Sequence, residues 1–135
     1  DFATTYTVLN ALMVLTLIVG GIVMMNAMLM SVFERTQEIG VLRALGWRRG
    51  RVVRMIVVES LALSFLSALA GIAIGVGLGF LFTLVPGFGA FLTPAYPPQV
   101  LVQVIALALI LGALGGLYPA WRAANMQPIE ALRYE

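Results

Sequence analysis

The side chains that could carry chemistry are few, and their types exclude most catalytic sites. The chain contains no cysteine and no histidine, which removes thiol catalysis, disulfide frameworks and the commonest zinc ligands. No apolar run holds a pair of carboxylates, and no Gly-rich turn is followed by Lys as in a P-loop. We therefore expect no catalytic residue, no metal site and no directly bound cofactor. Any ATP hydrolysis would then reside in another domain or subunit.

The charged side chains are concentrated in one segment. All eight basic residues are arginines, of which six lie between Arg35 and Arg54, while Arg122 and Arg133 follow the last apolar run. A basic balance can indicate nucleic-acid binding. However, 61% of the residues are hydrophobic and only 10% are charged, against about 45–50% and about 25% in soluble domains. Membrane topology explains the arginines better, so we expect a lipid bilayer and no nucleic acid as partner.

Three apolar runs are long enough to cross a bilayer, which takes about 20 helical residues. The chain is therefore predicted to be an all-α membrane protein with three transmembrane helices. Its predicted parts, in order, are a stalk end with the first transmembrane helix (1–33), a cytoplasmic connection (34–59), a second transmembrane helix (60–85), an extracytoplasmic loop rich in proline (86–99), a third transmembrane helix (100–118) and a tail (119–135) that starts at Pro119.

The arginine distribution predicts the orientation in the membrane. The connection 34–59 carries six arginines, the tail carries two and the proline loop carries none. The positive-inside rule then places the connection and the C-terminus in the cytoplasm, with Asp1 and the proline loop outside. We expect a multi-pass protein of the bacterial inner membrane. Because the chain starts at Asp1 without an initiator Met, we also expect it to be a piece of a longer polypeptide.

The charged connection is predicted to contain a short, weakly amphipathic helix over residues 34–45, at the membrane surface. We expect Ile39, Val41, Leu42 and Leu45 to share its apolar side. Gly46 is the expected C-terminal stop.

Small residues recur at a spacing of four in the second and third apolar runs, which places them roughly on one face of each helix. In lipid, such faces let helix backbones approach closely. Two interpretations stay open: static packing inside one subunit, or a seam that lets helices slide or dimerise. The predicted helix-packing residues are Ser67, Gly71, Gly75 and Gly79 in the second run, and Gly112 and Gly116 in the third.

Glu59 stands where the second apolar run begins, and a carboxylate at that depth is costly unless it is paired or reaches water. We interpret it as an ion-paired anchor with Arg51, Arg54 or Arg122 as the partner. A proton-relay role would need a second buried acid, and none lies in any predicted span.

A resemblance to a known family rests on two motifs. Residues 34–46 (ERTQEIGVLRALG) closely resemble the cytoplasmic loop of FtsX-like permeases, the group that contains macrolide exporters of the MacB type, lipoprotein-releasing permeases and the cell-division protein FtsX. Residues 118–120 (YPA), 122–124 (RAA) and 128–135 (PIEALRYE) look like the C-terminal end of MacB-type members. Trp47 departs from the pattern, because a small residue is more usual there.

The resemblance implies that residues 34–46 form a coupling helix that docks onto a nucleotide-binding ABC ATPase. Two permeases, as a homodimer or a heterodimer, would work with two ATPases that hold the ATP and Mg²⁺. A large extracytoplasmic domain would precede Asp1, and a periplasmic adaptor is a further partner. The ATPase-coupling residues implied by position are Glu34, Arg35, Glu38, Ile39, Gly40, Arg43 and Gly46.

Three functional hypotheses remain at this point. The first is a permease subunit of a MacB-type ABC transporter, which transmits ATP-driven motion to an extracytoplasmic domain for export or extraction of a substrate. The second is a regulator of the cell-division type, which passes the same motion to an extracytoplasmic enzyme. The third is a membrane anchor without ATP coupling. The tail motif favours the first.

Overall fold

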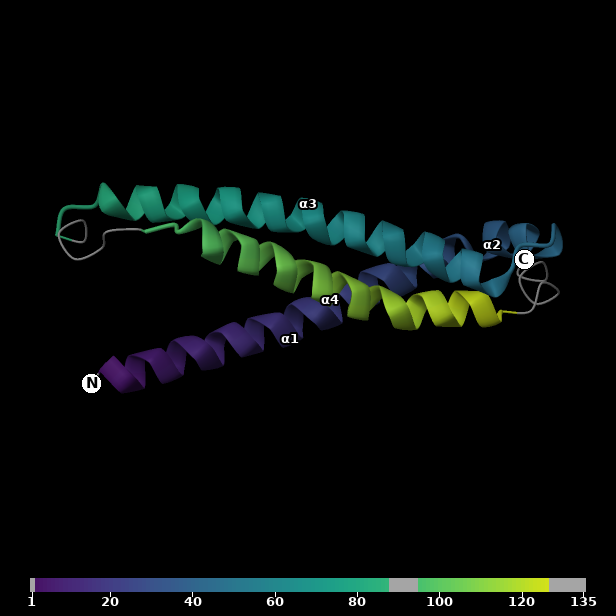
Figure 1. Cartoon of the computed structure of the whole chain (residues 1–135), viewed down its shortest axis with the longest axis horizontal. Coiled ribbons are helices and arrows are strands. Elements are labelled where there is room, and N and C mark those ends of the chain that lie inside the picture. Colours follow the sequence, from purple (N-terminus) through teal and green to yellow (C-terminus); the bar gives the residue numbers. More distant parts are fainter. Residues whose placement is uncertain (1, 88–94, 127–135) are drawn as a thin grey trace.

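The computed structural model describes residues 2–87 and 95–126, and these residues form four helices and no strand. The helices are α1 (Phe2–Glu34), α2 (Thr36–Ala44), α3 (Arg49–Thr83) and α4 (Pro98–Asn125) (Figure 1). By length and composition, α1, α3 and α4 can each cross a membrane. The predicted all-α membrane fold with three long apolar helices is confirmed.

Helix α4 is the centre of the bundle, because it packs against both α3 and α1. Figure 1 shows α3 and α4 running side by side, whereas the first half of α1 leads away from both. Residues 2–16 of α1 are accordingly all exposed. The helices converge at the opposite end, where α1 ends, α2 follows, α3 begins and α4 ends (Figure 1). We call this region the charged end, because seven of the arginines in the described residues lie in it.

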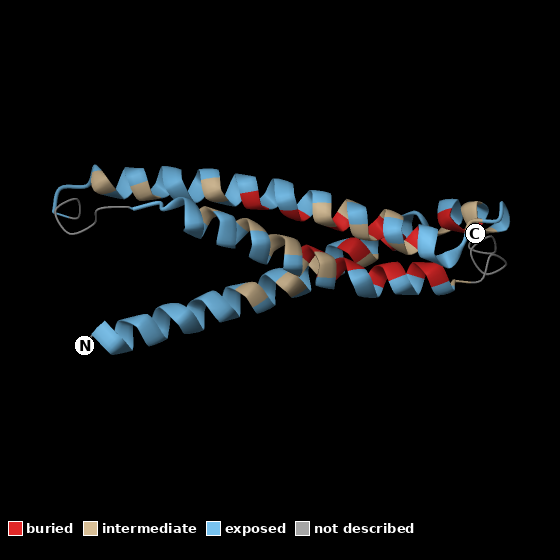
Figure 2. Ribbon diagram, in the orientation of Figure 1, coloured by how far each residue is buried: buried red, intermediate tan, exposed pale blue. Residues whose placement is uncertain are grey.

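The hydrophobic core lies at the charged end, as the buried positions in Figure 2 show. Away from it the helices are apolar but exposed, which is expected where lipid is the solvent. The core joins all four helices, and its buried members are Met28, Val32, Ile39, Val52, Ile56, Ala120, Ala123 and Ala124.

Two helices are longer than the predicted spans. Helix α3 begins at Arg49, so the second half of the predicted connection is helical. Helix α4 continues through Pro119 to Asn125 and does not stop where the tail was predicted to start. Pro119 lacks the N–H that would bond to the Gly115 carbonyl, but it is fully buried in the packed part of the bundle. Neighbouring helices make such a proline tolerable in membrane helices. Residues 88–94 of the predicted proline loop and 127–135 of the tail lie outside the described residues.

Candidate functional site

The charged end begins with a kink in the chain between α1 and α2. Only Arg35 separates the two helices, and its φ of −101° and ψ of 13° are not helical. Backbone hydrogen bonds still cross the break, from Arg35 N to Ser31 O (3.2 Å) and from Ile39 N to Arg35 O (3.0 Å). The Thr36 hydroxyl donates back to the carbonyls of Val32 and Phe33 at 3.1 and 2.8 Å. Back-bonding of this kind bends helices, so the kink is held by local hydrogen bonds and is not a loose linker.

The sequence interpretation assumed that α2 presents one apolar face. In the structure its apolar residues lie on different sides. Ile39 is only 3% exposed and belongs to the core, and Gly40 is buried beside it. Val41 and Leu45 are 45% and 75% exposed. At about 100° per residue, Val41 is rotated about 200° from Ile39, so the two cannot share a side. The helix therefore anchors itself through Ile39 and leaves an outer surface made of Glu38, Val41 and Leu45.

The end of α2 is a Schellman motif centred on Gly46. Gly46 has a φ of 94°, and its N–H bonds to the Arg43 carbonyl at 3.1 Å, while the Trp47 N–H bonds to the Leu42 carbonyl at 3.1 Å. This is the six-to-one and five-to-two pattern of that motif. The predicted stop at Gly46 is therefore confirmed. No atom lies within 4 Å of a Cβ added at Gly46, so the requirement for glycine comes from its backbone alone.

Replacing Gly46 with alanine is expected to destabilise this turn by about 1–2 kcal/mol, because an L-residue in the left-handed region suffers that penalty. Gly50→Ala is the matched control: Gly50 lies in the first turn of α3, also has no atom within 4 Å of an added Cβ, and has no positive φ. That change should be neutral or slightly stabilising. Thermal unfolding of the purified protein in detergent measures both. Equal effects of the two changes would contradict the backbone argument.

Arg43 and Trp47 stabilise the turn at Gly46 through their side chains. The Arg43 Nη1–H donates to the Trp47 carbonyl at 3.0 Å, and the Arg43 Nε is buried with no hydrogen-bond partner among the described residues. The Trp47 ring packs against the core, and the Arg51 guanidinium lies 4.6 Å from its centroid, in cation–π range. Trp47 thus has a structural role in this turn. The sequence showed only that a large residue stands where a small one is more usual, and not what its ring contacts.

Glu59 is ion-paired, as expected, but its partner is a different arginine. Glu59 Oε2 lies 3.1 Å from Arg35 Nη1. Arg54 precedes Glu59 by five residues on α3 and is therefore rotated about 140° away from it. The guanidinium of Arg122 instead lies 4.8 Å from the Phe33 ring. Sequence reasoning missed Arg35, because the partner became available only when the α1–α2 kink met α3.

Small residues form the contact between α3 and α4. Gly112 and Gly116 are buried on α4 and face Ser64 and Ser60 of α3. The Ser60 hydroxyl donates a hydrogen bond to the Gly112 carbonyl across the two helices. Ser60, Ser64 and Ala68 are the buried row of this part of α3, spaced by four residues like the predicted row. Their spacing is the signal that could have identified them.

The predicted small residues of α3 lie on nearly the same side of that helix as Ser60 and Ser64, but further along it. Ser67, Gly71 and Gly75 are exposed, and no atom lies within 4 Å of a Cβ added at Gly71 or Gly75. Gly79 lies under the side chain of Tyr96, whose Cζ would be 3.3 Å from an added Cβ. The contact of α4 with α1 uses Gly115, which packs against Met24. Among the described residues, Gly71 and Gly75 therefore have open space beside them, beyond the part of α3 that is buried against α4.

The predicted coupling residues divide into two groups in space. Ile39 and Gly40 are buried, Arg43 is bonded to the Trp47 carbonyl, and Arg35 is paired with Glu59 while half of its side chain stays exposed. Glu34, Glu38 and Gly46 are exposed. Within residues 2–87 and 95–126, no three metal-ligating side chains gather into a site for an ion. The exposed residues are the accessible part of the predicted set.

Three apolar helices of membrane-spanning length, joined at an arginine-rich end, define a multi-pass membrane protein. The chain belongs to the FtsX-like permease family, because residues 10–128 match the family described as FtsX-like permease C-terminal. This family indicates a transport component and not a catalytic one.

Individual relatives agree with the family match. The uncharacterized ABC transporter permease YknZ of Bacillus subtilis is 38% identical over 96% of this chain and 32% of its own length. The macrolide export ATP-binding/permease protein MacB of Bdellovibrio bacteriovorus is 38% identical over 98% of this chain and 20% of its own. The pyoverdine export ATP-binding/permease protein PvdT of Pseudomonas syringae is 39% identical over 98% and 19%. The chain thus spans about a fifth to a third of the length of these relatives.

Proposed function

We propose that the chain is the membrane part of a MacB-type ABC transporter permease, which transmits ATP-driven motion from a nucleotide-binding subunit to an extracytoplasmic domain for export or extraction of a substrate. The observation that carries the proposal is the outer surface of α2. This short helix projects Glu38, Val41 and Leu45 outward from the charged end while Ile39 holds it to the core.

The outer surface of α2 has the character of a protein contact. A leucine that is 75% exposed, next to an exposed valine and an exposed carboxylate, suits a partner with an apolar groove and a basic rim. The neighbouring arginines Arg48, Arg49 and Arg54 are exposed at the start of α3 and suit anionic lipid headgroups instead. The two kinds of surface divide the charged end between an ATPase and the bilayer.

The remaining parts of the proposal follow from orientation and assembly. The positive-inside rule places the charged end and the C-terminus in the cytoplasm of a bacterial inner membrane. ATP and Mg²⁺ would be held by the ATPase, since the chain has no P-loop. Two permeases would pair, and the second subunit would pack against Ser67, Gly71 and Gly75, which are exposed and where no described atom lies within 4 Å of a Cβ added at Gly71 or Gly75. A periplasmic adaptor would bind the outer domain.

Co-purification of the full-length parent protein with its ATPase tests this function. Leu45→Asp is expected to weaken association at least tenfold, because it places a second carboxylate in the apolar part of the contact. Leu84→Asp is the matched control: Leu84 is likewise the C-terminal cap of a helix, here α3, is 64% exposed and lies at the opposite end of the bundle. Unchanged association of Leu45→Asp would exclude α2 as the coupling element and favour a membrane anchor without ATP coupling.

A further inference from the structure

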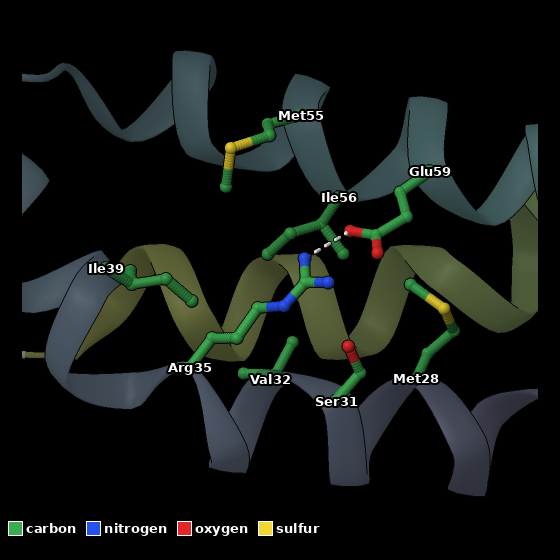
Figure 3. Close-up of a pocket in the computed structure, with 8 residues that line it drawn as sticks. All are labelled: Met28, Ser31, Val32, Arg35, Ile39, Met55, Ile56 and Glu59. Atoms are coloured by element: carbon green, nitrogen blue, oxygen red, sulfur yellow. Dashed lines mark hydrogen bonds and ion pairs between the residues drawn. The ribbon is translucent and has the colours of Figure 1, made fainter.

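We propose that the ion pair between Arg35 and Glu59 is a latch that makes α2 and α3 move together, so that Arg35 is a positioning residue inside the permease and not a contact of the ATPase. The inference rests on the proposed function, because it concerns how motion received by α2 reaches the membrane helices. Figure 3 shows the two side chains reaching toward each other from the α1–α2 kink and from α3.

The latch joins two elements that are far apart in the sequence, the α1–α2 kink and α3. Arg35 is the single residue between α1 and α2, and Glu59 lies on the part of α3 that enters the apolar run. Helices α1 and α3 each pack along α4, which is the partner they share. The pair at 3.1 Å, the one salt bridge among the described residues, therefore provides a direct polar connection from the kink to α3.

Arg35 and Glu59 are the two charged side chains in the lining of the pocket around the pair, among the described residues. The side chains of Met28, Val32, Ile39, Met55 and Ile56 surround it and are apolar, and Ser31 supplies the one hydroxyl in the lining (Figure 3). Carboxylates at such a boundary are costly when unpaired. A displacement of α2 that carried Arg35 away would therefore either draw Glu59 and α3 along or expose an unpaired charge.

The apolar lining also suits motion. Methionine side chains are unbranched and adapt to small shifts, and Met28 and Met55 face the pair from α1 and α3. Half of the Arg35 side chain and a third of the Glu59 side chain remain exposed, so the pair is accessible and is not locked in a dry core. The packing around the latch can thus rearrange while the charges keep the two elements in register.

Charge exchange in the full-length parent, reconstituted with its ATPase in lipid nanodiscs, tests the latch. Arg35→Glu and Glu59→Arg alone are expected to keep the ATPase bound but to lower permease-dependent stimulation of ATP hydrolysis at least tenfold. The double exchange Arg35→Glu with Glu59→Arg should recover most of that stimulation. Gln37→Glu is the control, because Gln37 is exposed two residues from Arg35 and the change adds a negative charge beside the kink without touching the pair.

The possible outcomes separate the latch from the proposed function. If Arg35→Glu abolishes association and Glu59→Arg does not restore it, Arg35 binds the ATPase and the latch is wrong, while the transporter function stands. If the single exchanges leave stimulation unchanged, or the double exchange fails to recover it, the latch is also wrong. Failure of the proposed function would show in a separate experiment: the Leu45→Asp variant would still associate with the ATPase as the wild type does.

A second variant keeps the inference testable if reversed charges prevent folding. The chain contains no cysteine, so Arg35→Cys with Glu59→Cys allows a single defined link within it by a short bis-maleimide. Before linkage, stimulation should be reduced as in the charge variants; after linkage it should return, because a covalent bridge replaces the latch. Stimulation that stays lost after complete linkage would overturn the proposal.

Discussion

Replacing Gly112 with valine is expected to separate α3 from α4 and to lower the free energy of unfolding by about 2–4 kcal/mol. A Cβ at this position would lie 2.6 Å from the Ser64 Cβ and 3.2 Å from the Ser60 carbonyl oxygen. The carbonyl belongs to the α3 backbone and cannot move aside alone. Overpacking of this kind costs about 1–3 kcal/mol.

The same change also removes a polar contact. When the helices are pushed apart, the Ser60 hydroxyl loses the Gly112 carbonyl. An interhelical hydrogen bond in a membrane contributes about 0.6 kcal/mol on average and up to about 1.7. The two losses together give the expected range. Reversible unfolding in mixed micelles, followed by helix content, measures it.

Gly71→Val is the matched control for this prediction. Gly71 lies in the middle of α3 and has open space around an added Cβ. The change should therefore shift the unfolding free energy of the single subunit by less than about 0.5 kcal/mol. If both variants were equally unstable, steric contact across α3 and α4 would not be the cause. If Gly71→Val altered only the dimer, this would support the second permease as the neighbour of that face.

The contrast between these two glycines shows what sequence reasoning could and could not achieve for the fold. Run length and arginine placement were enough to predict three long apolar helices. The spacing of small residues predicted close helix contacts, but not where along α3 they occur. Ser60 and Ser64 meet α4, whereas Gly71 and Gly75, rotated only about 20° from them, lie three turns further along with open space beside them. Lipid and helix interior are both apolar, so composition does not distinguish small residues that meet α4 from those further along the same side that have no described neighbour.

The candidate site shows a similar division. The motif in residues 34–46 located the charged end, and Gly46 was recognisable as a helix stop because only its backbone freedom matters there. The orientation of the Arg35 side chain depends on Glu59, and that of the Arg43 side chain depends on the Trp47 carbonyl. The first partner is 24 residues away along the chain. No local pattern could supply that contact, because it exists only once the kink lies against α3.

The largest functional effect is expected from Glu38→Arg, which should weaken binding of the ATPase about a hundredfold while leaving the fold intact. Glu38 is exposed in the first turn of α2, beside the exposed Val41. Reversing its charge would place like charges together at the proposed contact, whose partner is proposed to have a basic rim, and such juxtaposition costs several kcal/mol. The effect on α2 itself is limited to the loss of a favourable helix-dipole interaction, about 0.3–1 kcal/mol. Binding affinity and unfolding of the same preparation measure the two quantities.

Arg43→Glu should also weaken binding, but for a different reason. The change removes the hydrogen bond from Arg43 Nη1 and places a carboxylate near the Trp47 carbonyl. A hydrogen bond from a charged group contributes about 1.5–3 kcal/mol, so the turn after α2 should loosen and the protein should lose stability together with binding. Arg43→Gln is the milder comparison, because its amide can still donate a hydrogen bond.

Arg43 could act by stabilising the turn after α2 or by contacting the ATPase directly. Gly46→Ala distinguishes these two mechanisms, because it alters the same turn without changing any charge. If Arg43 acts through the turn, Gly46→Ala should reproduce its combined loss of stability and binding in weaker form, and Glu38→Arg should remain the variant that loses binding alone. If Arg43→Glu instead lost binding with an unchanged unfolding transition, its guanidinium would have to contact the ATPase directly. The bond to the Trp47 carbonyl and the burial of Nε argue for the turn, since a side chain held in this way has little freedom to reach a partner.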